Sequence, residues 1–209
     1  MEQLRLCLVT DRTQTGGRDL LAVVGECLAA RLPAVQLREK DLGGPELLGL
    51  ARELRRRTTV SGAWLIVNDR ADVALAAHAD GVQRTHASLS VEDLRIVADK
   101  RLRVGASVHS LDEAQAAEHA GAEWIFFGPL YDTPSKRRYG APQGLAALAR
   151  VTGKVEIPVI AIGGITPERV AEVRGAGAAG VAVISAILTA HSPAEATRRF
   201  LAALDATAR

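Results

Sequence analysis

The stretch PVIAIGGITPERVAEVRGAGAAGVAVIS, residues 158–185, contains one full unit of the predicted fold. The apolar run at 158–162 predicts a buried strand, and Thr166 followed by Pro167 is typical of a helix start. The helix expected at 167–175 is followed by a second apolar run at 180–184. A strand, a helix and another strand in this order indicate two parallel strands joined by a crossover helix.

The same unit recurs along the chain. Strands are expected at 4–9, 34–37, 64–67, 81–83, 103–107, 124–127, 158–162 and 180–184, and helices at 20–30, 45–57, 71–78, 91–99, 111–120, 144–151, 167–175 and 193–208. The strands are apolar runs without strict alternation, as expected of parallel strands covered on both faces. Eight strand–helix rounds in 209 residues predict an α/β protein, a compact (β/α)8 TIM barrel with residues 1–209 as a single domain. A doubly wound open sheet is the alternative, although no glycine fingerprint opens the first helix.

Composition and charge narrow the classes of partner. The chain has 26 basic and 24 acidic residues, a net charge of +2, and 3% aromatic residues. This balance gives no argument for nucleic-acid binding, and the arginines at 52 and 55–57 are expected to form a solvated helix face. No apolar stretch has the length of a membrane span and the N-terminus lacks a signal-peptide pattern, so we expect a cytoplasmic protein without membrane partners. Cys7 and Cys27 lie in apolar patterns and are expected to be buried, unpaired thiols.

Polar residues and glycines gather directly after the predicted strands, where TIM barrels place their active sites. The candidates are Gln36, Arg38 and Lys40 after the second strand, Asn68 and Asp69 after the third, Ser107 after the fifth, Thr133, Ser135 and Lys136 after the sixth, Gly163 and Gly164 after the seventh, and Ile184 and Ser185 after the eighth. This clustering at one end of the barrel predicts an enzyme.

Several of these groups suit anions and a metal ion. The pairs Gly163-Gly164 and Ile184-Ser185 each precede a helix, as in the phosphate site after strands seven and eight of many barrels, because glycine admits the ligand and helix starts present free N–H groups. The hydroxyls and cations of loop 133–136 suit a second anionic group. Asp69 is the candidate ligand for Mg²⁺ bridging to a diphosphate. Glu39 is expected to pair with a neighbouring cation.

Six segments together resemble the thiamine-phosphate synthase and thiazole tautomerase superfamily. They are 35–40 (VQLREK), 67–70 (VNDR), 104–110 (VGASVHS), 128–136 (GPLYDTPSK), 162–165 (IGGI) and 183–186 (VISA), in order on the expected strands. The resemblance covers nearly the whole chain. In the synthases, a hydroxymethylpyrimidine diphosphate loses diphosphate with the help of Mg²⁺, and the nitrogen of a thiazole phosphate captures the pyrimidine cation.

The resemblance also implies a role for each candidate residue. Gln36, Arg38 and Lys40 would line the pyrimidine diphosphate site, Asn68 would contact the pyrimidine, Asp69 would hold Mg²⁺, Ser107 and Lys136 would bind diphosphate oxygens, Thr133 and Ser135 would flank the thiazole phosphate, and Gly163, Gly164, Ile184 and Ser185 would form its nest. Arg38, Ser107 and Lys136 are therefore the candidate catalytic residues. Mg²⁺ is the expected cofactor, and small phosphorylated molecules are the expected substrates.

One segment departs from the synthase pattern. After the fourth strand the synthases usually carry a His-Leu-Gly run and then an aspartate that is a second magnesium ligand. Here the segment is GVQRTHASLS, residues 81–90, and Ser88 occupies the aspartate position. The loss of one carboxylate is expected to weaken Mg²⁺ binding and the departure of diphosphate.

These residues are also consistent with two other functions. The run SLSV at 88–91 resembles the tautomerases, which isomerise a thiazole carboxylate phosphate without a metal. Pro129 stands where their best-known form has its acid–base histidine, and His86 is the candidate substitute. The other function is that of a non-catalytic homologue that only binds a thiazole phosphate. The outer helices also leave room for a homo-oligomer.

Overall fold

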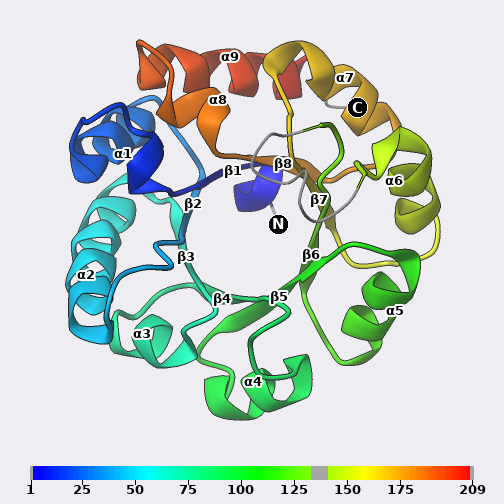
Figure 1. The fold of residues 1–209 in the computed structure, drawn as a ribbon, viewed down its shortest axis with the longest axis horizontal. Helices are drawn as coiled ribbons and strands as arrows, with labels where there is room; N and C mark the ends of the chain where they lie inside the picture. Colours follow the sequence, from blue (N-terminus) through cyan, green and yellow to red (C-terminus); the bar gives the residue numbers. More distant parts are fainter. Residues whose placement is uncertain (1, 133–140, 208–209) are drawn as a thin grey trace.

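The computed structural model describes residues 2–132 and 141–207 and contains a closed barrel of parallel strands. The strands are β1 (Leu6–Val9), β2 (Ala34–Leu37), β3 (Trp64–Asn68), β4 (Gly81–Arg84), β5 (Arg103–Val108), β6 (Trp124–Phe127), β7 (Val159–Ile162) and β8 (Gly180–Val183). Each strand pairs with the next, and β8 pairs with β1 (Figure 1). The predicted (β/α)8 barrel is confirmed, and the open-sheet alternative is wrong.

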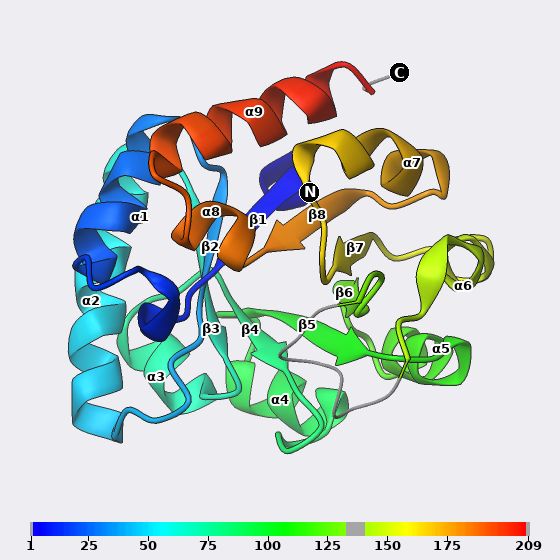
Figure 2. The ribbon, with the colours of Figure 1, turned by 45° about the horizontal axis from the view of Figure 1, so that its top comes forward.

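Helices form a ring around the strands (Figure 1). They are α1 (Leu20–Ala29), α2 (Gly44–Ser61), α3 (Ala71–Ala76), α4 (Val91–Ala98), α5 (Leu111–His119), α6 (Gly144–Thr152), α7 (Val170–Gly175), α8 (Ser185–Leu188) and α9 (Pro193–Asp205), with 3-10 turns η1 (Glu2–Arg5), η2 (Arg12–Gln14) and η4 (Pro167–Arg169). Figure 2 shows α9 spanning from α1 to α7, so the last helix closes the ring. Among the described helices, none is long and apolar enough to cross a membrane.

The strands are mostly apolar because both of their faces are covered. One face packs against the helices, and the other fills the inside of the barrel. The interior cluster includes Cys7, Ala34, Ile66, Trp124, Phe126, Ile160 and Ala182. The inner positions change to polar residues toward the carboxyl ends, for example Gln36, Asn68 and Ser107. The barrel therefore has an apolar floor and a polar mouth.

The start of the chain closes the amino end of the barrel. The η1 turn lies across the centre of the barrel in Figure 1, and Leu4 is fully buried among the interior side chains. Gly180 permits this approach, since a Cβ at that position would lie 2.1 Å from the Leu4 carbonyl oxygen. The site described below lies at the opposite end.

The element boundaries differ from the predictions in a few places. Helix α2 continues to Ser61 instead of ending at 57, because Gly62 at φ +70° provides its left-handed C-cap. Helix α8 was not predicted, since four residues are too few for a helical period. Thr166 makes no side-chain cap, and the expected helix 167–175 divides into η4 and α7. Ser90 caps α4, its hydroxyl accepting from the Asp93 N–H at 3.0 Å.

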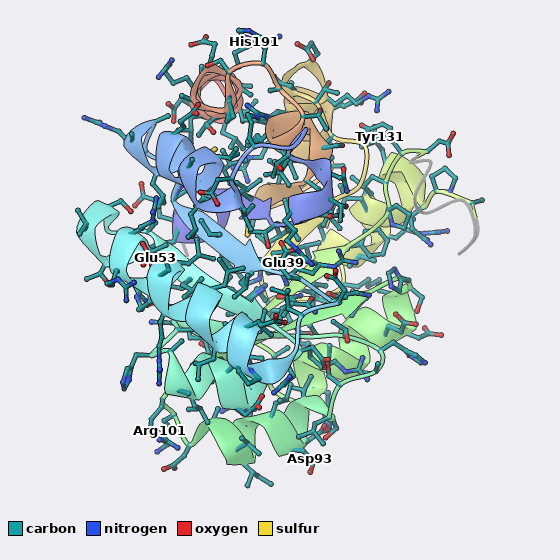
Figure 3. All side chains as sticks on the ribbon, turned by 60° about the vertical axis from the view of Figure 1, so that its left-hand side comes forward. Glu39, Glu53, Asp93, Arg101, Tyr131 and His191 are labelled. Atoms are coloured by element: carbon teal, nitrogen blue, oxygen red, sulfur yellow. The ribbon has the colours of Figure 1, made fainter. Side chains whose placement is uncertain are left out.

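Of the arginines predicted to form a solvated face of α2, Arg52 and Arg56 are exposed, whereas Arg55 and Arg57 are half-buried and ion-paired. Arg55 pairs with Asp80 at 2.6 Å, and Arg57 pairs with Glu53 at 3.1 Å. Figure 3 shows Glu53 on the outer side of the molecule along α2. The Arg55 and Asp80 side chains are only 19% and 26% exposed, so their pair links α2 to the residue before β4. More exposed pairs stabilise a fold by at most about 1 kcal/mol.

The two cysteines are free and buried, as predicted. Burial raises the pKa of the Cys7 thiol to about 12 and that of the Cys27 thiol to about 11. Both thiols therefore stay protonated near neutral pH, and they act as small apolar side chains of the core.

Candidate active site at the carboxyl end of the barrel

A cavity of about 540 Å³ lies at the carboxyl ends of the strands, a volume that suits a small organic ligand. Of the predicted site residues, those that line it are Gln36, Arg38, Lys40, Asn68, Ser107, Gly163, Gly164, Ile184 and Ser185. Thr133, Ser135 and Lys136 lie outside the described residues. The residues that the sequence placed after five different strands thus meet at one cavity.

The segment after β2 forms the basic wall of the cavity. Gln36 occupies the last inner position of β2, and Arg38 and Lys40 follow it along the chain. The Arg38 N–H donates to the hydroxyl of fully buried Thr10 at 2.9 Å. This bond ties the end of β2 to the end of β1 and fixes the backbone that carries both cations.

Glu39 is turned away from the cavity and holds Arg12. Glu39 is 6% exposed, and its carboxylate accepts from the Arg12 backbone N–H at 3.1 Å and from the Arg12 guanidinium at 3.2 Å. The same guanidinium contacts Asp41 at 2.6 Å and holds the pKa of that carboxyl below its usual range. The prediction that Glu39 pairs with a cation is confirmed, and among the described residues Arg38 and Lys40 are the arginine and lysine side chains that line the cavity.

The segment after β3 brings an amide and a carboxylate to the mouth of the barrel. Asn68 lines the cavity, and its Oδ1 accepts from Gln36 Nε2 at 3.4 Å. Asp69 is not among the lining residues; its backbone lies in the left-handed region at φ +68°, and its carboxylate accepts a hydrogen bond from the Ser88 hydroxyl. Ser88 is held in turn by the Thr85 N–H, which donates to Ser88 Oγ at 2.8 Å.

The oxygens of Asp69 and Ser88 are the candidate donors for the expected Mg²⁺. Within ranges 2–132 and 141–207, no group of three or more His, Cys, Asp or Glu side chains gathers as a metal site. Mg²⁺ is usually held by one or two carboxylates, with waters and substrate phosphates as its other ligands. One carboxylate beside a neutral hydroxyl fits a site of this shared kind, with one negative charge fewer than two aspartates would supply.

Two histidines line the cavity near Ser107. His109 follows β5, and its Nδ1 contacts the carbonyl oxygen of Gly128, so Nδ1 carries a hydrogen. His86 lies in the segment after β4. His86 is the candidate acid–base group of the tautomerase alternative, whereas the sequence pattern predicts no role for His109.

Backbone groups form the opposite end of the cavity. Gly163 and Gly164 have φ of +102° and +68°, and a Cβ at Gly163 would lie 2.7 Å from Pro129 Cα. The Gly163 carbonyl accepts from the Tyr131 N–H at 3.1 Å, and the Gly164 carbonyl accepts from Arg169 at 2.5 Å. Because both carbonyls are engaged with these partners, the turn can present its N–H groups to an anion.

Helix α8 begins at the same end of the cavity as the glycine turn. Ile184 precedes this helix and Ser185 opens it, and both residues line the cavity. The two halves of the predicted phosphate site, one after β7 and one after β8, therefore border one space.

A clamp joins the loop after β6 to helix α7. The Arg169 guanidinium lies 4.1 Å from the centre of the Tyr131 ring, and the Tyr131 hydroxyl donates to Glu172. Burial, together with the nearby Glu172 carboxylate, raises the pKa of Tyr131 to about 12. The phenol therefore stays a neutral donor near pH 7, and Arg169 links this clamp to the glycine turn.

The sequence reasoning missed three polar residues of the cavity. They are Gln14, Thr85 and Gln143. Gln14 ends the η2 turn after β1, so the rule applied to the other strands would have found it. Gln143 directly precedes α6, far along the chain from the end of β6, and no pattern in the sequence marks it.

The fold and the cavity together define a (β/α)8 barrel enzyme whose cavity is lined by the cations Arg38 and Lys40 and by the glycine turn at 163–164. The comparison with family models is more specific. The thiamine monophosphate synthase family model matches residues 6–187, and the chain belongs to this family. The superfamily resemblance is confirmed.

Relatives and solved structures support the same assignment. The chain is 41% identical to the thiamine-phosphate synthase of Roseiflexus castenholzii over 91% of this chain and 84% of that protein. It is also 41% identical to the thiamine-phosphate synthase of Moorella thermoacetica, over 95% of each chain. The thiamine phosphate pyrophosphorylase from Pyrococcus furiosus superimposes with a TM-score of 0.92 at 34% identity, covering 99% of this chain and 98% of that one. The two relatives are named thiamine-phosphate synthase and the solved structure thiamine phosphate pyrophosphorylase, and the chain is a transferase of thiamine biosynthesis.

Proposed function

We propose that the chain joins a hydroxymethylpyrimidine diphosphate to a thiazole phosphate, releasing diphosphate and forming thiamine phosphate. The observation that carries this proposal is that a cationic wall and a glycine-rich turn border one cavity. Arg38 and Lys40 suit the diphosphate, and Gly163 with Gly164 suits the single phosphate. Two anionic substrates can thus bind together with their phosphates at different ends.

The reaction breaks one bond and forms another. The bond between the pyrimidine methylene carbon and a diphosphate oxygen breaks, and its electron pair leaves with the diphosphate. The lone pair of the thiazole nitrogen then forms the new carbon–nitrogen bond. Arg38, Lys40 and Ser107 offset the charge that develops on the leaving diphosphate, and Gln36 and Asn68 orient the pyrimidine. A thiazole already held by the glycine turn captures the cation without a diffusional step.

Asp69 and Ser88 are the residues that would hold Mg²⁺, and the ion would neutralise charge on the diphosphate when bound. Side chains of the protein itself bind and orient the substrates. The cations after β2 bind and orient the diphosphate, while the amides of Gln36 and Asn68 fix the ring.

A coupled assay on the purified protein tests the proposal. Both substrates are supplied with Mg²⁺ and then with a chelator, and thiamine phosphate and diphosphate are measured. We expect product that depends on Mg²⁺. Turnover of a thiazole carboxylate phosphate without metal would instead identify a tautomerase. Binding of thiazole phosphate without either turnover would identify a non-catalytic homologue.

Replacing Ser88 with aspartate is expected to lower the Mg²⁺ concentration that gives half-maximal rate by about 3- to 10-fold, because it adds a second carboxylate beside Asp69. Without metal the same variant is expected to melt at a lower temperature than the parent protein, since two adjacent carboxylates repel each other. Rates measured over a Mg²⁺ titration, and melts in chelator, check both effects.

Ser192→Asp is the matched control for this substitution. Ser192 caps α9, where aspartate is an equally good cap, and the change in charge is the same. An unchanged Mg²⁺ requirement in Ser88→Asp would exclude position 88 from the metal site.

A further inference from the structure

A chain of hydrogen bonds runs inside the barrel beneath Ser107. The Trp124 Nε1–H donates to Gln83 Oε1 at 2.8 Å, and Gln83 Nε2 donates to Ser107 Oγ at 3.1 Å. Trp124 and Gln83 are both fully buried, whereas Ser107 lines the cavity. This series of hydrogen bonds therefore connects the closed interior of the barrel to the proposed diphosphate site.

The indole group sets the donor-to-acceptor direction of these hydrogen bonds. An indole N–H can only donate, so the carbonyl oxygen of Gln83 must face Trp124. The NH₂ group of Gln83 must then face Ser107, whose oxygen accepts. The hydroxyl hydrogen of Ser107 is left to donate to another acceptor, and the cavity is where an anionic ligand would supply one.

Glycines make room for the indole to reach Gln83. Gln83, Gly105 and Trp124 lie side by side on β4, β5 and β6. A Cβ at Gly105 would lie 2.1 Å from Trp124 Cε2, and one at Gly81 would lie 2.9 Å from Trp124 Cη2. Gly105 thus lets the indole cross over β5, and a side chain there would displace the donor that orients Gln83.

We propose that Gln83 is a positioning residue which, held by Trp124, keeps Ser107 as a hydrogen-bond donor to diphosphate. The inference rests on the proposed function for the identity of the anion. Gln83 does not line the cavity itself, so it acts through Ser107. A side chain that accepted from Ser107 would consume the hydrogen that the ligand needs.

Gln83→Glu tests this direction with almost no change of shape. A carboxylate accepts from both Trp124 and Ser107, and we expect it to weaken binding of Mg²⁺-pyrophosphate by about 10- to 100-fold at pH 8, the range for a lost bond to a charged group. On protonation the carboxyl can donate to Ser107 again. The loss of pyrophosphate affinity relative to the parent protein should therefore become smaller as the pH falls. Because the introduced glutamate is buried, its pKa should lie above the ordinary range for a glutamate.

A double-mutant cycle with Ser107→Ala separates positioning from simple charge repulsion. Calorimetry gives pyrophosphate affinities for the parent, Gln83→Glu, Ser107→Ala and the double variant. If Gln83 acts through Ser107, the penalty of glutamate should fall to less than one third of its value once the hydroxyl is absent. A penalty of the same size in both backgrounds would overturn the inference.

Trp124→Phe provides a second variant, in case a buried glutamate prevents folding. It removes the indole donor, frees the Gln83 amide to rotate, and is expected to weaken pyrophosphate binding by about 3- to 10-fold. Ile160→Val, another loss of volume in the interior cluster, should leave the affinity unchanged. Equal effects of these two substitutions would also overturn the inference.

Pyrophosphate affinity is measured without turnover, so the two proposals can fail separately. A parent protein that binds pyrophosphate, shows the cycle and makes no thiamine phosphate would contradict the proposed function alone. Full synthase activity with no coupling between positions 83 and 107 would contradict the positioning role alone. A parent that does not bind Mg²⁺-pyrophosphate would contradict the donor role of Ser107 and with it this inference.

Discussion

Replacing Gly163 with valine is expected to weaken thiazole phosphate binding by about 30- to 1000-fold and to lower the melting temperature. Gly163 has φ +102°, and a Cβ there would lie 2.7 Å from Pro129 Cα, so a branched side chain must move the glycine turn or the loop after β6. Backbone strain and overpacking of this kind cost about 2–4 kcal/mol together. Calorimetry with thiazole phosphate and a thermal melt measure the two effects.

Gly49→Ala is the control for this substitution. Gly49 lies within α2, with open space around its Cα. Alanine in a helix interior should stabilise the protein by about 0.5–1 kcal/mol and leave binding unchanged. Normal thiazole phosphate affinity in a folded Gly163→Val protein would show that the phosphate binds away from this turn.

The barrel itself could be predicted from the sequence because its signal is repeated. Each strand is a short apolar run followed by polar residues or glycine, and eight such units leave little choice of topology. Gln36 illustrates why much of the site could also be predicted from the sequence. It ends an apolar run on an inner position, and in a barrel that position faces the mouth.

Contacts between side chains that are far apart in the sequence could not be predicted from it. Gln83 stands at the end of a predicted strand like several candidates, yet its partner Trp124 lies 41 residues away. Only the register of β4, β5 and β6 shows that Gly105 lies between Gln83 and Trp124 and leaves room for their hydrogen bond. The sequence likewise marked Ser88 as a departure, but it gave no sign that the hydroxyl bonds to Asp69.

Asp69→Asn is expected to lower kcat by about 100-fold or more and to leave thiazole phosphate affinity unchanged, because it removes the one charged oxygen ligand of the Asp69–Ser88 pair. Asparagine is the matched substitution here. It tolerates the left-handed backbone at φ +68°, where alanine would add strain, and its Oδ1 can still accept from Ser88. The fold and the second substrate site should therefore be preserved while the carboxylate charge is lost.

The measurement is kcat at saturating substrates over a Mg²⁺ titration, with Asp72→Asn as the control. Asp72 pairs with Arg70 on the exposed start of α3, and losing such a pair should change activity by less than about twofold. An Asp69→Asn enzyme with the parent Mg²⁺ response would exclude Asp69 as a ligand. The charge of the departing diphosphate would then be offset by the cations of the wall after β2, Arg38 and Lys40, and by the Ser107 hydroxyl.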